Sequence, residues 1–329
     1  MKKITAMILL LAMVLALAAC SGGTNADDKN TDSSEDTYTI GVLYLDQEVL
    51  LSEATAGCQA YAAEHSNVKL IEYNANKDVS TQLKQCENLI SQNVDAIALT
   101  PVDGAGCDQI INACKDAGIP LICFHAKVKG APITNILFDN VGFGKMQVDY
   151  AMEIFEKSGG DMNGTINVGI VTGKLDNQNA VERCQGYEEQ LKNYANATIV
   201  DEQVGSWNRD DAMAIAENWI TSGRDIDIIL SNNDAMAIGI SLAYANANVE
   251  RPIIIGVGGT KEGLTAILNG DFDGTVFQPA YQNGYDAIDF TVKYLNGETL
   301  EESYVTEGVL VTPETAQATL DDLNAMLNS

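Results

Sequence analysis

The sequence predicts an α/β fold made of two lobes, each a parallel sheet covered by helices. Short apolar runs typical of strands alternate along the chain with amphipathic stretches typical of helices. Strands that alternate with helices in this way form parallel sheets with right-handed crossovers. Eight such units are more than one sheet holds comfortably. We therefore predict two lobes, with a single large doubly wound domain as the alternative.

The elements follow one another from residue 39 onward. The predicted strands are Thr39–Leu45, Val68–Tyr73, Ala96–Leu99, Leu121–Phe124, Ile166–Val171, Thr198–Asp201, Ile226–Leu230 and Ile253–Val257. The predicted helices are 52–65, 79–92, 104–117, 141–157, 178–193, 209–222, 234–246 and 260–268. The change of lobe is expected around Phe138 to Val141, where Asp139 and Asn140 can cap the long helix that follows.

The first residues have the pattern of a secretory signal. Lys2 and Lys3 precede an apolar run from Ile4 to Ala19, which is shorter than the roughly 20 residues of a membrane span. The run ends at Leu-Ala-Ala-Cys, which resembles the lipobox of bacterial lipoproteins. We predict a signal peptide over 1–19 and a diacylated Cys20, because two acyl chains suffice for durable anchoring. An ordinary signal peptide with a chance cysteine is the alternative.

Residues 20–37 are rich in Ser, Gly, Asn, Thr and Asp, and they predict a flexible tether between the anchor and the lobes. The chain is strongly acidic, with a formal net charge of −27. Such a charge opposes binding to nucleic acid or to an anionic membrane surface. A solvated surface explains it, and the lipid anchor is the only membrane contact that we expect.

The cysteines and histidines do not form a metal-binding pattern. Six cysteines follow Cys20, without a Cys-x-x-Cys motif, and the chain has only two histidines. Four of the cysteines lie in apolar stretches and predict buried free thiols, whereas Cys58 and Cys184 could still find a partner. Nucleophile-elbow, phosphate-loop and zinc-protease motifs are absent as well. We expect no catalytic residues, no metal and no cofactor.

Polar residues follow the predicted strands, and ligands of open parallel sheets bind outside the carboxyl ends of the strands. Two lobes that face each other across such loops make a cleft that closes on a ligand. In the first lobe the candidate ligand-binding residues are Asp46, Glu48, Lys77 and His125, and in the second Asn177 and Asn179. A solvated rim position is the alternative for each charged residue. His125 could also make binding depend on pH near neutrality.

Several short motifs, in order and at matching spacing, resemble the ribose- and galactose-type periplasmic sugar-binding proteins from about Ile40 to near the C-terminus. They are Asp78–Leu83, Asn93–Ile97, Thr100–Asp103, Ala117–Pro120, Asp139–Val141, Arg183-x-x-Gly186-Tyr187 and Asn232–Gly239. The resemblance implies a periplasmic binding protein type 1 fold, with two Rossmann-like lobes joined by a three-segment hinge. It implies a first lobe of 38–139 plus 279–306 and a second of 140–278 plus 307–329.

The resemblance also implies three further ligand contacts. Trp207 stands where the family places a stacking aromatic, Asn233 where it places a binding amide, and Gln278 where a hinge amide reaches the ligand. Core packing is the alternative for Trp207, and capping of the next helix is the alternative for Asn233.

At other positions the chain departs from the family pattern. Lys77 replaces an expected asparagine, His125-Ala126 replaces an Asp-Arg pair, Val181 stands near an expected arginine and Gly258 replaces an aspartate. The loop that usually reads Asn-Pro-Phe-Phe is Glu48–Leu51 here. Arginine forks and carboxylates are strong, directional ligands for hydroxyl groups. An ordinary aldopentose or aldohexose is therefore not assumed.

The function that the resemblance implies is capture of a small polar ligand, most simply a sugar, for a bacterial ABC importer. The expected partners are the ligand and the ABC permease subunits, and we expect a monomer on the extracellular face of the membrane. A sensor that reports its bound state to a kinase or chemoreceptor is the alternative role. Nucleosides, cyclitols and sugar-like signals are the alternative ligands. An enzyme is not expected.

Overall fold

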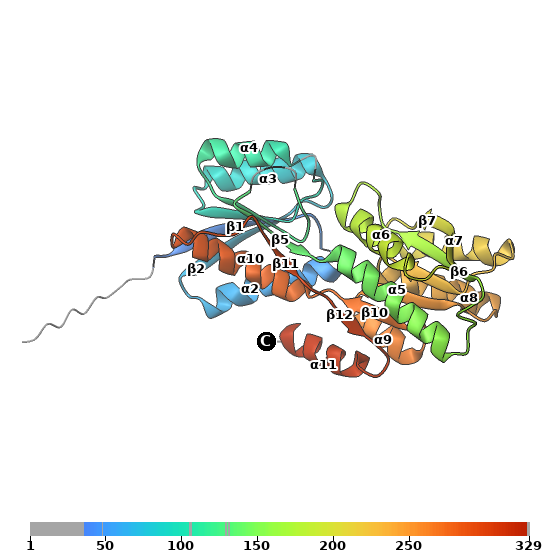
Figure 1. Ribbon diagram of the computed structural model, residues 1–329. Helices are drawn as coiled ribbons and strands as arrows, with labels where there is room; N and C mark the ends of the chain where they lie inside the picture. The colour runs from blue at the N-terminus through green and yellow to red at the C-terminus, as the bar shows by residue number, and fades with distance from the viewer. Residues whose placement is uncertain (1–35, 48, 105–106, 129, 131, 328–329) are drawn as a thin grey trace, which may run out of the picture. The chain divides into compact units, whose positions relative to one another are not determined.

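The computed structural model describes residues 36–47, 49–104, 107–128, 130 and 132–327 (Figure 1). The predicted signal peptide, Cys20, Glu48 and the tether before residue 36 lie outside the described residues, so those predictions stay untested. None of the helices in the described part is both long and apolar enough to cross a membrane.

The strands of the described residues form two six-stranded sheets. The first sheet has the order β11-β5-β4-β3-β1-β2, and all of its neighbours are parallel. The second has the order β12-β10-β9-β8-β6-β7, and only β12 runs antiparallel to its neighbour β10. The prediction of two α/β lobes is confirmed, and the alternative of one doubly wound domain is wrong.

The elements of the first lobe come from two parts of the chain. Its strands are β1 (Tyr38–Tyr44), β2 (Val68–Asn74), β3 (Ala96–Leu99), β4 (Leu121–Phe124), β5 (Thr134–Phe138) and β11 (Ser303–Thr306). The helices that pack on this sheet are α2 (Val49–Glu64), α3 (Val79–Ser91), α4 (Asp108–Ala117) and α10 (Ala280–Leu295).

The second lobe repeats this arrangement. Its strands are β6 (Ile166–Thr172), β7 (Ala197–Val204), β8 (Ile228–Ser231), β9 (Ile253–Gly258), β10 (Gly274–Phe277) and β12 (Val309–Val311). Its helices are α5 (Asn140–Lys157), α6 (Gln178–Leu191), α7 (Arg209–Thr221), α8 (Asp234–Ala247), α9 (Lys261–Asn269) and α11 (Ala316–Leu327).

All eight predicted strands and all eight predicted helices are present, with ends that shift by a few residues. Four strands were not predicted: β5, β10, β11 and β12. They are three to five residues long, and all but β12 contain polar residues or glycine, so they lack the continuous apolar run of β3 and β4. The helices α10 and α11 are not among the eight predicted ones either. The helix predicted to begin at residue 104 begins at Asp108, and its cap position, Cys107, makes no side-chain capping bond.

Both faces of each sheet are buried because helices cover both. In β8, Ile229 packs into one core, whereas Ile228 and Leu230 pack into the core on the opposite face. A strand buried on both faces reads as a continuous apolar run. Full burial of each such side chain stabilises the fold by roughly 1.5–3 kcal/mol. These central strands are therefore the part of the fold that the sequence predicts best.

The chain crosses between the sheets at three places: from β5 to α5, from β10 to α10 and from β11 to β12. The backbone N–H of Asp139 donates to Thr306 O at 3.0 Å, which joins the first crossing to the third. The side-chain Nδ2 of Asn283, in the first turn of α10, donates to Ile136 O at 3.2 Å. The lobe boundaries predicted within these crossings stay a prediction.

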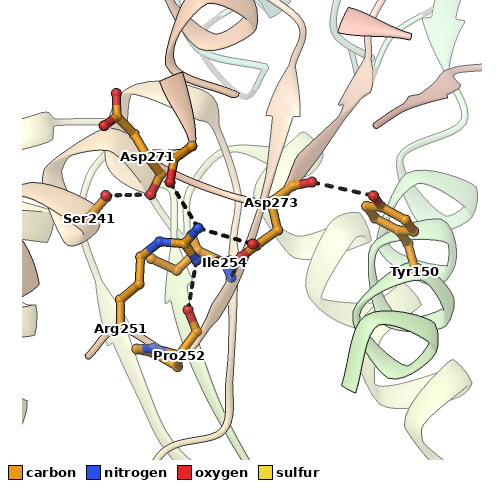
Figure 2. Close-up of polar contacts among 8 residues, drawn as sticks. Tyr150, Ser241, Arg251, Pro252, Ile254, Asp271 and Asp273 are labelled. Carbon is orange, nitrogen blue, oxygen red and sulfur yellow. Dashed lines mark hydrogen bonds and ion pairs between the residues drawn. The ribbon is translucent and has the colours of Figure 1, made fainter. Parts of the chain in front are cut away.

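Loops at the amino ends of β9 and β10 are held by an ion pair between Arg251 and Asp273 (Figure 2). Two guanidinium nitrogens of Arg251 donate to the two carboxylate oxygens at 2.6 and 3.0 Å. Asp273 also accepts from Ile254 N at 2.8 Å, and its carbonyl accepts from Tyr150 OH at 3.4 Å. This network lies at the opposite end of the strands from the loops that carry the predicted site.

The six cysteines of the described residues are free thiols, and all but the half-buried Cys184 are buried. The predicted buried free thiols are therefore confirmed. Cys86 on α3 and Cys114 on α4 bring their Sγ atoms to 3.6 Å, a contact that was not predicted because the two helices meet only in the folded lobe.

Two glycines let α2 and α10 pack closely. A Cβ atom on Gly284 would lie 1.9 Å from Ala54 O, and one on Gly57 would lie 1.9 Å from Tyr281 O. No side chain fits at such distances, so the backbones of the two helices must separate if either glycine gains a methyl group. The close packing of α2 against α10 therefore fixes the position of α10 where it follows the crossing from β10.

We predict that Gly284→Ala lowers the free energy of unfolding by about 1–3 kcal/mol, because overpacking outweighs the helix preference for alanine. Guanidinium denaturation measures the change. The control is Gln282→Ala, an exposed position of the same helix turn, with an expected change within about 0.5 kcal/mol. Equal stability of Gly284→Ala and the natural protein would contradict the packing described.

Candidate functional site

The predicted site residues that the structure describes follow strand ends at the carboxyl edges of the two sheets. In the first lobe, residues of this set follow β1, β2 and β4; in the second, they follow β6, β7, β8 and β10. They are Asp46, Lys77 and His125, and Asn177, Asn179, Trp207, Asn233 and Gln278. This edge is where open parallel sheets bind their ligands.

Lys77 and Trp207 occupy matching positions in the two lobes. Each follows the second strand of its lobe and is the second of two residues with left-handed backbone, at φ 62° for Lys77 and 66° for Trp207. Asp78 and Asn208 then cap the next helices. The same loop geometry therefore presents a cation in one lobe and an aromatic ring in the other.

Asp46 and Lys77 form an ion pair within the first lobe, with 3.3 Å between Lys77 Nζ and Asp46 Oδ2. The Asp46 side chain is 8% exposed and that of Lys77 is 52% exposed. The lysine therefore keeps its head group close to solvent while it partners a nearly buried carboxylate.

His125 lies at the end of β4 with left-handed backbone, at φ 70°. Its ring meets Phe138 edge-on at 5.5 Å, and its buried Nδ1 has no hydrogen-bond partner among the described residues. Its carbonyl oxygen accepts from Asn179 Nδ2 at 3.3 Å, so the two lobes touch here. Burial, and next the charge of Arg183, lower the pKa of His125 to about 4. This lowered pKa argues against the suggested dependence of binding on pH near neutrality.

The two predicted amides at the start of α6 have different roles. Asn177 caps the helix, since its Oδ1 accepts from Asn179 N at 2.9 Å. Asn179 is buried, and its Oδ1 accepts from Asn140 Nδ2 at 3.2 Å. Asp139 caps α5 as predicted, but Asn140 turns inward instead, because its side chain binds Asn179 and the buried Arg183.

The centre of the site is Arg183, which the sequence offers only as part of a motif and not as a candidate site residue. The side chain is 3% exposed. Nε donates to Asn140 Oδ1 at 2.9 Å, Nη2 donates to Gln278 Oε1 at 2.7 Å, and Nη1 donates to the carbonyl of Asn232. Burial lowers its pKa to about 10, so the guanidinium stays charged at neutral pH. Val181, near the arginine position that the family implies, is 42% exposed.

Trp207 is half-buried beside this guanidinium. The Arg183 Cζ atom lies 5.6 Å from the centre of the indole ring, within the range of cation–π attraction. A Cβ atom on Gly173 would lie 2.2 Å from the ring, so the glycine makes room for the indole. Asn233 Oδ1 caps α8 by accepting from Met236 N at 2.9 Å, and its Nδ2 donates to Trp207 O at 3.3 Å.

Asp234 is a second residue that sequence reasoning missed. It is buried, it accepts from Thr275 Oγ1 at 2.6 Å and from Thr260 N at 3.0 Å, and burial raises its pKa. A Cβ atom on Gly258, at φ +141°, would lie 3.0 Å from its Oδ2. An aspartate at position 258 would therefore strain the backbone and crowd a buried carboxylate. This accounts for the glycine where the family has an acid.

Contacts through Arg183 and Asn140 thus join His125, Asn179, Trp207 and Gln278, whereas Asp46 and Lys77 pair within the first lobe. A hollow of about 480 Å³ lies elsewhere, beside the edge strand β7, and none of the predicted site residues lines it. Its lining residues are Asp201, Gln203, Ile215, Asn218, Trp219, Thr221, Ser222 and Arg224.

Two lobes with the same strand order, three crossings and polar loops at both carboxyl edges define a periplasmic binding protein of type 1. Residues 42–299 match the family described as periplasmic binding protein domain. The chain belongs to this family.

Named relatives and a solved structure agree with this assignment. The chain is 30% identical over 312 residues to a xylitol-binding protein of Mycolicibacterium smegmatis. This alignment covers 94% of this chain and 84% of the relative. It is 26% identical over 302 residues to a ribose import binding protein of Haemophilus influenzae, covering 92% and 96%. An ABC transporter solute binding protein from Bacillus halodurans with bound myo-inositol superposes with a TM-score of 0.78 at 29% identity, covering 87% and 98%.

We predict that Arg183→Met lowers the free energy of unfolding by about 2–4 kcal/mol, because three buried acceptors lose their donor. Denaturation in guanidinium measures this loss. The control is Arg209→Met, since Arg209 pairs with Glu262 on the surface and an exposed pair contributes about 0–1 kcal/mol. Similar losses for both variants would show that the buried network does not stabilise the lobe.

We predict a pH dependence of stability from His125. Its pKa is near 6.5 in the unfolded chain and about 4 in the fold, so only the unfolded chain takes up this proton between those values. The contribution of His125 to the free energy of unfolding is fully present above pH 6.5, and it is lost as the pH falls towards 4. His125→Gln should remove on the order of 2 kcal/mol of that loss, measured by urea denaturation at pH 7 and 4.5. Parallel pH profiles for the two proteins would refute it.

Proposed function

We propose that this chain is the sugar- or polyol-binding component of an ABC importer, which holds its ligand between the carboxyl edges of the two lobes. The observation that carries this proposal is the meeting of the lobes at Asn179 and His125. Contacts through Asn140 and Arg183 connect this point to the half-buried indole of Trp207. An aromatic face next to amide and imidazole groups suits a compound that has both C–H faces and hydroxyl groups.

The relatives support a polyhydroxylated ligand. Those named for xylitol and ribose, and the solved structure that holds myo-inositol, cover most of this chain. Two of these three compounds are polyols without a sugar carbonyl group. The ligand-binding residues that we propose are Asp46, Glu48, Lys77, His125, Asn177, Asn179, Trp207, Asn233 and Gln278.

The proposal also includes the absence of catalysis, the membrane anchor and the partner that receives the ligand. The family consists of binding proteins, and we propose that this chain captures its ligand without converting it. A lipid on Cys20 would hold the protein at the extracellular face of the membrane. The protein would act there as a monomer and deliver its ligand to ABC permease subunits. Labelling with a lipid precursor, compared between the natural protein and Cys20→Ala, tests the anchor.

We predict that a member of a small ligand panel raises the melting temperature, because a ligand that binds only the folded state stabilises it by mass action. The panel is xylitol, myo-inositol, D-ribose, D-xylose and D-allose. At about 100 times the dissociation constant the gain is roughly 2.7 kcal/mol, or about 5–10 °C. Thermal unfolding with each compound measures it. Unchanged melting with every member, or conversion of the ligand, would refute the proposal.

We predict that Trp207→Ala weakens binding of the ligand so identified by about tenfold, because the stacking face is lost. The chain has two tryptophans, and the control is Trp219→Phe, since Trp219 lies on α7 and donates to Asp201 at 2.8 Å. Calorimetric titration gives both affinities. In the Trp219→Phe protein, emission of the remaining indole should also change on binding. Full affinity of Trp207→Ala would exclude stacking.

A further inference from the structure

Glu53, in the second turn of α2, is a buried carboxylate that is not yet accounted for. The residue is 3% exposed, and neither Oε1 nor Oε2 has a hydrogen-bond partner among the described residues. By contrast, Glu72 on the neighbouring β2 accepts from Tyr44 OH at 2.8 Å. A buried acid without a partner is costly, so its retention points to a partner that binds from outside the chain.

The position of Glu53 is between the lobes. The helix α2 follows β1, so its first turns lie at the carboxyl edge of the first sheet. The charges that act on Glu53 are those of Asp234 and Lys261, which begin α8 and α9 at the carboxyl edge of the second sheet. The lobes therefore come close to each other near Glu53, at the carboxyl edges where the proposed site lies.

The pKa of Glu53 is raised to about 8, mainly by burial; the charge of Asp234 contributes to this rise and that of Lys261 opposes it. The carboxyl group is therefore largely protonated at pH 7, and it can then donate one hydrogen bond and accept others.

His125 gives a second unsatisfied group on the same lobe. Its Nδ1 is buried without a partner among the described residues, and the second-lobe charge of Arg183 acts on it. A neutral imidazole nitrogen either donates or accepts, according to its tautomer. Each of these two groups needs a partner that can donate or accept a hydrogen bond, and a hydroxyl group can do both.

We infer that Glu53 is an additional ligand contact, which binds neighbouring hydroxyl groups of an uncharged polyol held between the lobes. This inference rests on the proposed function and adds a residue that no family motif in the chain predicts. It assigns to the first lobe a contact from α2 itself, in the second turn of that helix.

The test compares Glu53→Gln and Glu53→Leu with the natural protein by calorimetric titration of xylitol and myo-inositol. Loss of one hydrogen bond should weaken binding by about 5- to 10-fold in Glu53→Gln, and loss of all of them by about 30-fold or more in Glu53→Leu. The control is Glu87→Gln, an exposed glutamate on α3 of the same lobe, with unchanged affinity expected.

Thermal unfolding without ligand separates a binding role from a structural one. Removal of an unsatisfied buried acid should leave the melting temperature of Glu53→Leu equal to or above that of the natural protein. An affinity of Glu53→Gln within about twofold of the control overturns the inference, whatever its melting temperature. If the natural protein binds no member of the ligand panel, the proposed function fails; if it binds and the Glu53 variants bind equally well, only this inference fails.

Discussion

The site depends on one constraint, which is that the buried guanidinium of Arg183 must keep its hydrogen-bond partners. A charge that is 3% exposed is tolerated only where polar groups surround it. The acceptors come from the start of α5, the end of β8 and the hinge residue Gln278. These segments are distant in sequence, and the arginine fixes their relative positions. The ring of Trp207 then rests beside a group that cannot move without loss of those bonds.

Much of this architecture could be predicted from the sequence, because it depends on local periodicity. Strands such as β3 and β4 are buried on both faces and appear as short apolar runs. The strands β11 and β12 have exposed residues and three or four positions each, and they exist only because they pair with the ends of the two sheets. Their register is decided by tertiary pairing, which no short pattern encodes.

The site was predicted less completely, for a related reason. Polar residues after strands are visible in the sequence, and Lys77 was proposed in that way, whereas Trp207 was proposed from the resemblance to the family. Arg183 and Glu53 were missed because a charged residue within a helix is normally solvated. A signal was present for Arg183: it shares the buried face of α6 with Ala180, Tyr187 and Leu191. A charge on an apolar stripe deserves to be treated as a candidate site residue.

The ionisable groups at the carboxyl edges of the two sheets also indicate what kind of ligand the site suits. Burial lowers the pKa of His125 to about 4 and raises that of Glu53 to about 8, and it raises the pKa of Asp234. Each of these groups is shifted towards its neutral form, and Arg183 keeps its charge only within a set of oriented acceptors. An environment that disfavours charge on its own side chains also disfavours a charged ligand that brings no counter-ion. An uncharged, hydroxyl-rich compound loses the least on entering it, since each hydroxyl can replace its water partners with an amide, an imidazole or a carboxyl group.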